Sequence, residues 1–305
     1  MYPEKKIEEE KSLEITGELI LERKYTRSSL YKDAWKRLKK NKLAMLGLAI
    51  VISLILIAIF ANFISPYNPI ERIKVESLFS PSRAHFFGTD LLGRDIFSRV
   101  IYGSRISIEV GIIAVGISMF IGLFFGALSG YFGNISDAVI MRVADIFFAF
   151  PYILGAIAIM TILGPGIINI FIAIGVLGWA YFARIFRSSI LSIKNKEYIE
   201  AARALGASNY RIITRHIFPN AMAPIIVYAT MNVGTAIIVE AALSFLGIGV
   251  QPPTPAWGKM LAESLDYIDI APWMMLFPGL AIVITVLGFV LLGDGLRDAF
   301  DPKLR

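Results

Sequence analysis

The residues most able to make charged contacts lie in one polar block of an otherwise apolar chain. The block spans residues 197–220 and reads EYIEAARALGASNYRIITRHIFPN. Apolar residues recur at helical spacing on both sides of Gly206, which predicts two short helices with one apolar face each. They are Tyr198, Ala201, Ala202 and Leu205 before the glycine, and Tyr210, Ile213 and Ile217 after it. The charged residues are Glu197, Glu200, Arg203, Arg211 and Arg215. This pattern favours contact with a protein partner or with lipid headgroups.

No residue pattern in the chain predicts bond-making chemistry. A phosphate-binding G-x-x-x-x-G-K-[ST] loop is missing, since Gly258-Lys259 is followed by Met260 and lacks the leading glycine. Hydrolase patterns such as G-x-S-x-G and H-E-x-x-H are missing too. The sequence has no cysteine, and its two histidines, His85 and His216, are far apart. We therefore predict that the chain is not an enzyme and has no catalytic residues, metal site or cofactor of its own.

The composition is typical of a protein that crosses the membrane several times. Hydrophobic residues make up 56% of the chain and charged residues 18%, and the mean hydropathy is +0.66. The formal net charge of +6 could indicate nucleic acid, but lysines and arginines that fix cytosolic loops give the same balance. We predict an all-α membrane protein that does not bind nucleic acid.

Six apolar segments are long enough to cross a bilayer as helices. They are residues 43–64, 106–132, 139–163, 167–186, 223–248 and 273–292. Residues 1–42 form a cytosolic segment with an interfacial helix, residues 65–105 an external loop, and residues 293–305 a cytosolic tail. The permease-like core would then be residues 106–292. Basic residues before the first segment predict cytosolic termini, although the external loop is also basic; long loops cross the membrane largely regardless of charge.

Local signals predict how these elements begin, bend and pack. In the polar block, Gly206 should stop the first helix, Ser208 or Asn209 should cap the second, and Pro219 should end it. Asp90 should cap a short helix that Gly103 closes, and Pro151 and Pro278 should kink their helices. Arg142 and Asp145, three residues apart, can pair on one helix face. Gly122, Gly126 and Gly130 form a stripe of small residues. The stripe predicts close helix packing within the chain, or against another chain.

Glu240 is the one acid well inside a predicted span, where an unpaired charge costs a few kcal/mol. It either lines an aqueous pathway or makes a structural hydrogen bond to a neighbouring helix. The residues alone leave both readings open.

The polar block resembles the EAA loop of permease subunits of binding-protein-dependent ABC importers. The matching residues are Glu200, Ala201, Ala202, then Gly206, then Ile217, Phe218 and Pro219. The resemblance implies that the bent pair is a coupling helix that docks on a cytosolic ATPase through Glu200, Ala201, Ala202, Arg203, Gly206 and Pro219. A loop that merely lies on the lipid headgroups is the alternative.

Other blocks resemble the second permease subunit of dipeptide, oligopeptide and nickel importers. They are LKKNKLA at 38–44, FGTDLLGRD at 87–95, SFLG at 244–247, QPPTPAWG at 251–258 and LGDGLRD at 292–298. This resemblance implies a type I importer permease in the cell (plasma or inner) membrane, beside a second homologous permease, two ATPase subunits that bind ATP and magnesium, and an external solute-binding protein. It favours peptide import, with nickel or oligosaccharides as alternatives. Two alternative functions belong to a different class. They are a secondary transporter or channel that needs no ATPase, and a membrane scaffold.

Overall fold

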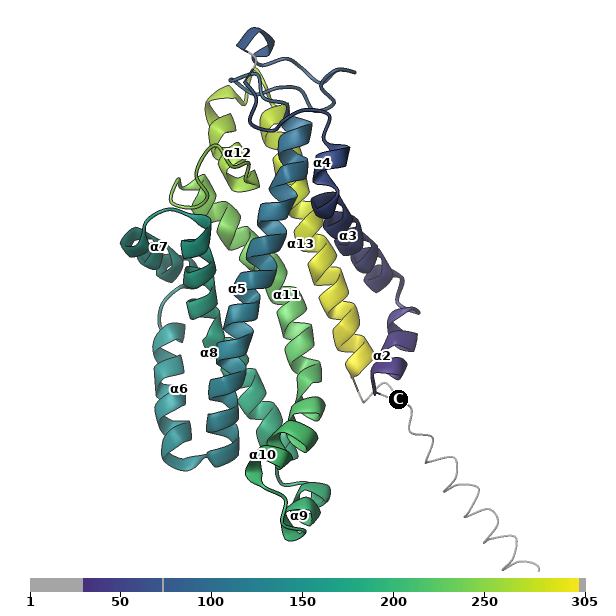
Figure 1. The fold of residues 1–305 in the computed structure, drawn as a ribbon, viewed down its shortest axis with the longest axis vertical. Coiled ribbons are helices and arrows are strands. Elements are labelled where there is room, and N and C mark those ends of the chain that lie inside the picture. The colour runs from purple at the N-terminus through teal and green to yellow at the C-terminus, as the bar shows by residue number, and fades with distance from the viewer. Residues whose placement is uncertain (1–29, 73, 302–305) are drawn as a thin grey trace, which may run out of the picture.

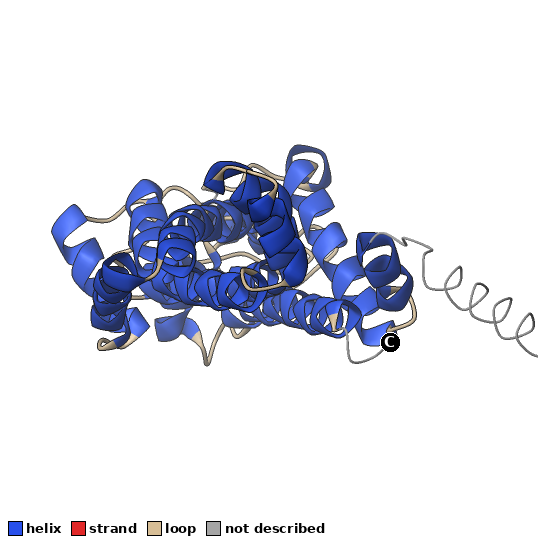
Figure 2. Cartoon of the chain, turned by 90° about the horizontal axis from the view of Figure 1, so that it is seen from below, coloured by secondary structure: helices blue, strands red, loops and turns tan. Residues whose placement is uncertain are grey.

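Long apolar helices set the shape of the molecule, because most of the chain must satisfy its backbone hydrogen bonds within itself. The structure is a computed structural model that describes residues 30–72 and 74–301. Residues 1–29 and 302–305, which belong to the expected cytosolic segment and tail, lie outside the described residues. Figure 1 shows the helices gathered around one long axis, and Figure 2 shows the bundle along that axis.

The elements follow the chain in this order. The first part holds α2 (Leu30–Leu38), α3 (Lys42–Ile59), α4 (Ala61–Ile64), η1 (Lys74–Glu76), α5 (Ile96–Phe132), α6 (Asn134–Phe148), α7 (Tyr152–Leu163) and α8 (Ile167–Ile193). The second part holds α9 (Glu197–Ala204), α10 (Asn209–Ile212), the π-helical turn η2 (Ile213–Ile217), α11 (Phe218–Phe245), α12 (Trp257–Ser264), η3 (Leu265–Tyr267) and α13 (Trp273–Phe300).

Five helical segments in the described chain are long and apolar enough to cross a membrane, and a bent pair makes up to six. The pair is α6 and α7, which meet at 89° across a break that contains Pro151. The predicted number of spans is confirmed when the pair counts as one, and the bend expected at Pro151 is a full break. Pro278, in contrast, lies inside α13, which continues as one helix to Phe300.

The helix expected after Asp90 begins later and runs much further. Asp95 is its N-cap, and the Oδ2 atom of Asp95 accepts a hydrogen bond from the backbone N–H of Ser98 at 2.7 Å. Asp90 instead accepts from the backbone N–H groups of Leu92 and Arg94. Gly103 does not close the helix; a Cβ atom there would lie 2.6 Å from Trp257 Cδ1, so the glycine permits close packing. The helix α5 therefore starts inside the expected external loop and continues to Phe132.

The glycine stripe on α5 packs against α8 of the same chain. A Cβ atom at Gly122 would lie 2.7 Å from the backbone oxygen of Trp179, and one at Gly126 would lie 2.7 Å from that of Ala183. Gly130 faces Ile190 in the same way, at 3.0 Å from its Cβ atom. Small residues allow this close approach of two helix backbones. The stripe thus serves packing within the chain, one of the two expected uses.

Two ion pairs join α6 to α8. The Nε and Nη2 atoms of Arg187 lie 2.5 and 2.6 Å from the two carboxylate oxygens of Asp137. The Nη2 atom of Arg184 lies 2.6 Å from Asp145 Oδ1. The expected pair between Arg142 and Asp145 was therefore wrong, because the facing helix supplies the arginine.

A buried charge cluster joins α5 and the segment before it to α12, at the end of the bundle shown at the top of Figure 1. Arg94 Nη2 lies 2.7 Å and Arg99 Nη2 3.3 Å from Glu263 Oε2. Asp90 Oδ2 lies 2.6 Å from Arg94 Nε. Both arginine side chains are buried, so each needs its counter-charge.

Replacing Glu263 with alanine should destabilise this end of the molecule. The change leaves two buried arginines with Asp90 as their carboxylate partner. Breaking a buried pair costs about 3–5 kcal/mol, and we expect about 3 kcal/mol because the Glu263 side chain is 26% exposed. The midpoint of thermal unfolding in detergent measures the loss. Asp266→Ala, at an exposed position three residues along, is the control, and equal midpoints for the two variants would contradict the role of the cluster.

Candidate coupling site

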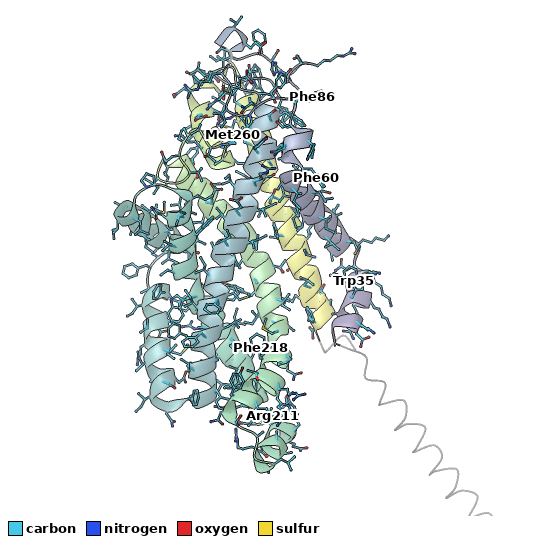
Figure 3. All side chains as sticks on the ribbon, viewed as in Figure 1. Trp35, Phe60, Phe86, Arg211, Phe218 and Met260 are labelled. Atoms are coloured by element: carbon cyan, nitrogen blue, oxygen red, sulfur yellow. The ribbon has the colours of Figure 1, made fainter. Side chains whose placement is uncertain are left out.

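The polar block folds into α9 and α10 at one end of the bundle. The described start of the chain, α2, and the last turns of α13 lie toward the same end (Figure 1). Figure 3 shows Arg211 and Phe218 at this end and Met260 of α12 toward the other. The candidate site is thus separated from the charge cluster around Glu263 by the length of the bundle.

The end of α9 is a Schellman motif centred on Gly206. Its φ is +79°, a left-handed conformation that glycine adopts without steric cost. The Gly206 N–H donates to the Arg203 oxygen at 3.0 Å, and the Ala207 N–H donates to the Ala202 oxygen at 3.1 Å. The prediction that Gly206 stops the first helix is confirmed.

The second half of the block continues into the next span without a break. Ser208 is the cap, because its Oγ atom accepts from the Arg211 N–H at 3.3 Å. The helix then passes through the π turn η2 into α11, and residues 209–245 form one helical segment. Pro219 does not end the helix, contrary to expectation. It sits in the first turn of α11, where the wider π turn before it accommodates a residue without an N–H.

The exposed side chains of the block differ from the expected polar faces. Glu200 and Arg203 are exposed as predicted, and Gly206 and Pro219 are exposed too. Of the two alanines expected on the apolar face, Ala201 is exposed and Ala202 is half-buried. Leu205 and Tyr210, expected on apolar inner faces, are 88% and 78% exposed. We call Glu200, Arg203, Leu205 and Tyr210 the tip surface. A surface that combines charges with large exposed apolar groups is typical of a protein-docking site.

Other residues hold the α9–α10 pair onto the bundle. Ile199, Ile212 and Ile217 are fully buried in the main core. The Tyr131 hydroxyl, at the end of α5, donates to Asn209 Oδ1 at 2.6 Å. Sequence reasoning missed Ile199 and Ile212 because the helices are too short for a clear apolar stripe. Leu205 lies outside the expected apolar face of α9 because it follows the last residue of that helix.

A cavity of about 690 Å³ lies between the block and the neighbouring helices. The block supplies Tyr198, Pro219 and Asn220 to its wall, and α11 continues the wall to Met231. The helices α2, α8 and α13 complete it with side chains such as Arg37, Ile185 and Arg297. The cavity therefore extends from the start of α9 to the middle of the helical segment of residues 209–245.

Glu240 lies deep in α11 and does not line the cavity of about 690 Å³. It is 0% exposed, and its Oε1 atom accepts a hydrogen bond from Ser244 Oγ at 2.8 Å. The hydrogen bond stays within α11, one turn along, rather than reaching a neighbouring helix. A role of Glu240 in lining a pathway stays a prediction.

Two family models match the chain. Residues 122–305 match the binding-protein-dependent transport system inner membrane component, and residues 29–81 match the N-terminal transmembrane domain of oligopeptide transport permease C. The chain is 50% identical to the dipeptide transport system permease protein DppC of Alkalihalophilus pseudofirmus, over 93% of both proteins. It is 48% identical to the glutathione transport system permease protein GsiD of Escherichia coli, over 90% of this chain and 91% of that one.

A further relative is the oligopeptide transport system permease protein OppC of Bacillus subtilis, 46% identical over 91% of both proteins. Among solved structures, the inward-facing MetNI methionine ABC transporter has a chain with a TM-score of 0.54 and 20% identity, covering 67% of this chain and 97% of that one. That likeness supports the fold, and the sequence matches extend over nearly the whole length. The chain therefore belongs to the family of binding-protein-dependent transport system inner membrane components.

Proposed function

We propose that the chain is the permease subunit of an ATP-driven importer and couples to the ATPases through the tip surface. The observation that carries this proposal is the exposed, firmly anchored α9–α10 pair. Its side chains face outward at the end of the bundle, while Ile199, Ile212 and Ile217 fix it to the core. An exposed helix pair that is fixed to the core can pass motion from a docked partner to the span that follows it.

The partners follow from the family and from this geometry. A second homologous permease completes the pathway, two ATPase subunits bind ATP and magnesium on the cytosolic side, and a solute-binding protein delivers solute from outside. The tip surface and both termini face the cytosol in this arrangement. The basic residues before α3 favour it, and α2, α9 and the end of α13 lie toward one end of the bundle.

A small peptide is the proposed solute. Relatives that share 46–50% of their residues with this chain are named for dipeptide, glutathione and oligopeptide transport. In the proposed complex, ATP-driven closure of the ATPases shifts the permease between two conformations. The ATPases can shift this equilibrium only by as much as their binding free energy differs between the two permease conformations.

Reconstitution of the complete transporter tests the proposal. The chain is co-expressed with its neighbouring permease and ATPases, purified in mild detergent and placed in proteoliposomes with the binding protein. We expect uptake of labelled dipeptide against its gradient only with ATP and loaded binding protein. Uphill uptake by this chain alone would overturn the coupling proposal. Uptake of Ni²⁺ or an oligosaccharide with no dipeptide uptake would overturn the substrate and leave the coupling intact.

A further inference from the structure

Two buried polar atoms in the described residues have no hydrogen-bond partner. They are Ser107 Oγ on α5 and Glu240 Oε2 on α11. Both residues are 0% exposed. A buried polar atom without a partner lowers the stability of the folded protein, so two of them in one protein require an explanation.

Packing contacts above and below place the two residues opposite each other. A Cβ atom at Gly111 of α5 would lie 2.7 Å from Val233 Cγ1 and 3.6 Å from Ile237 Cγ1 of α11. Eight residues earlier on α5, Gly103 packs against Trp257.

The residue after Trp257, Gly258, packs against the backbone of Ala241 on α11. Residue numbers therefore rise along α5 as they fall along α11. Ser107, midway between the two glycines, is level with the turn from Ile237 to Ala241. Glu240 belongs to that turn, on the face that Val233 and Ile237 turn toward α5, because residues three and seven apart share a helix face.

The carboxylate oxygen of Glu240 that does have a partner belongs to a chain of hydrogen bonds toward α12. Its Oε1 atom accepts from Ser244 Oγ at 2.8 Å, and Ser244 Oγ accepts from the Val250 N–H at 3.0 Å. Val250 lies in the segment that connects α11 to α12. A partner on Oε2 would extend this chain across the contact to α5.

We propose that one buried water molecule bridges Ser107 Oγ and Glu240 Oε2. A water needs at least two polar partners in a closed site, and these two atoms provide them from facing helices. No ion pair in the described residues supplies Glu240 with a counter-charge, and its Oε2 atom has no hydrogen-bond partner there. The bridge joins α5, α11 and the segment before α12 through one polar node, which we call the Ser107–Glu240 node.

A double-mutant cycle in the assembled transporter tests the node. We expect Ser107→Ala and Glu240→Gln each to lower the midpoint of thermal unfolding. The double variant should lose clearly less than the sum of the two shifts, because each change alone already breaks the bridge. Ser118→Ala is the matched control: it is also buried on α5, but its hydroxyl donates to the Gly175 oxygen of α8. Combined with Glu240→Gln, it should be additive.

Two further measurements do not depend on the stability of a Glu240 variant. The carbon–oxygen stretching band of the Glu240 carboxyl group should shift in Ser107→Ala and stay in place in Ser118→Ala. A high-resolution cryo-electron microscopy map should show a water peak between the two side chains that is missing in Ser107→Ala. Additive midpoints, an unshifted band or a map without the peak would overturn the proposal.

Discussion

Replacing Gly206 with proline should abolish ATP-driven uptake. Proline holds φ near −65°, whereas Gly206 has φ +79°, and proline lacks the N–H that Gly206 donates to the Arg203 oxygen. The Schellman motif at the end of α9 would be lost, and with it the fixed angle between α9 and α10. The rest of the fold should persist, because nothing lies within 4 Å of a Cβ atom at this position. Peptide uptake and ATPase activity, measured on the same proteoliposomes, separate lost coupling from lost assembly.

Matched variants separate coupling from general damage. Gly164→Pro removes a glycine of similar conformation, φ +83°, together with its N–H bond to Met160, but at the end of α7. It should retain more uptake than Gly206→Pro. Glu200→Lys should reduce uptake more than Glu197→Lys, since both reverse a charge in the first turn of α9 while Glu200 belongs to the tip surface. Normal uptake in both Gly206→Pro and Glu200→Lys would contradict the assignment of the coupling site.

Replacing Gly122 with valine should prevent stable packing of α5 on α8. A Cβ atom there would lie 2.7 Å from the Trp179 oxygen and 2.9 Å from the Ala183 nitrogen, which are backbone atoms that cannot rotate away. Overpacking of a core costs about 1–3 kcal/mol, and we expect at least the upper value because two helix backbones must separate. The fraction of the chain that stays monodisperse in detergent after heating measures the effect.

Gly116→Val provides the control on the same helix. Nothing lies within 4 Å of a Cβ atom at Gly116, in contrast to the backbone atoms that a Cβ atom at Gly122 would meet. This variant should behave like the parent protein. Similar losses at the two positions would show that valine disturbs the helix itself rather than its contact with α8.

The membrane spans could be predicted from the sequence because the length of an apolar run is set by the thickness of the bilayer and not by the neighbouring helices. Apolar runs of sufficient length become helices whatever packs beside them, so α3, α5, α8, α11 and α13 were predictable. Helix ends are less so, because several residues can serve as a cap. Asp90 and Asp95 both precede an apolar stretch, and only the fold shows that Asp95 caps α5 while Asp90 binds Arg94.

In the candidate site, the turn was predictable and the outer surface was not. A glycine between two short amphipathic stretches indicates a helix end, and Gly206 forms one. The exposure of Leu205 and Tyr210 depends on where the cap falls, which periodicity does not determine. The complete burial of Glu240 depends on helices packed around α11 that are distant in sequence, so residue type alone left its role open.

The continuous helical segment of residues 209–245 has a mechanical consequence. It is about 55 Å long at 1.5 Å per residue. It packs closely near Val233 and Gly234, against Gly111 on one side and Phe289 on the other. If it tilts about that contact as a lever, the arm that ends at Asn209 is about twice as long as the arm that ends at Phe245. A wide swing at the Asn209 end then becomes a shorter and more forceful displacement at the Phe245 end, beside α12.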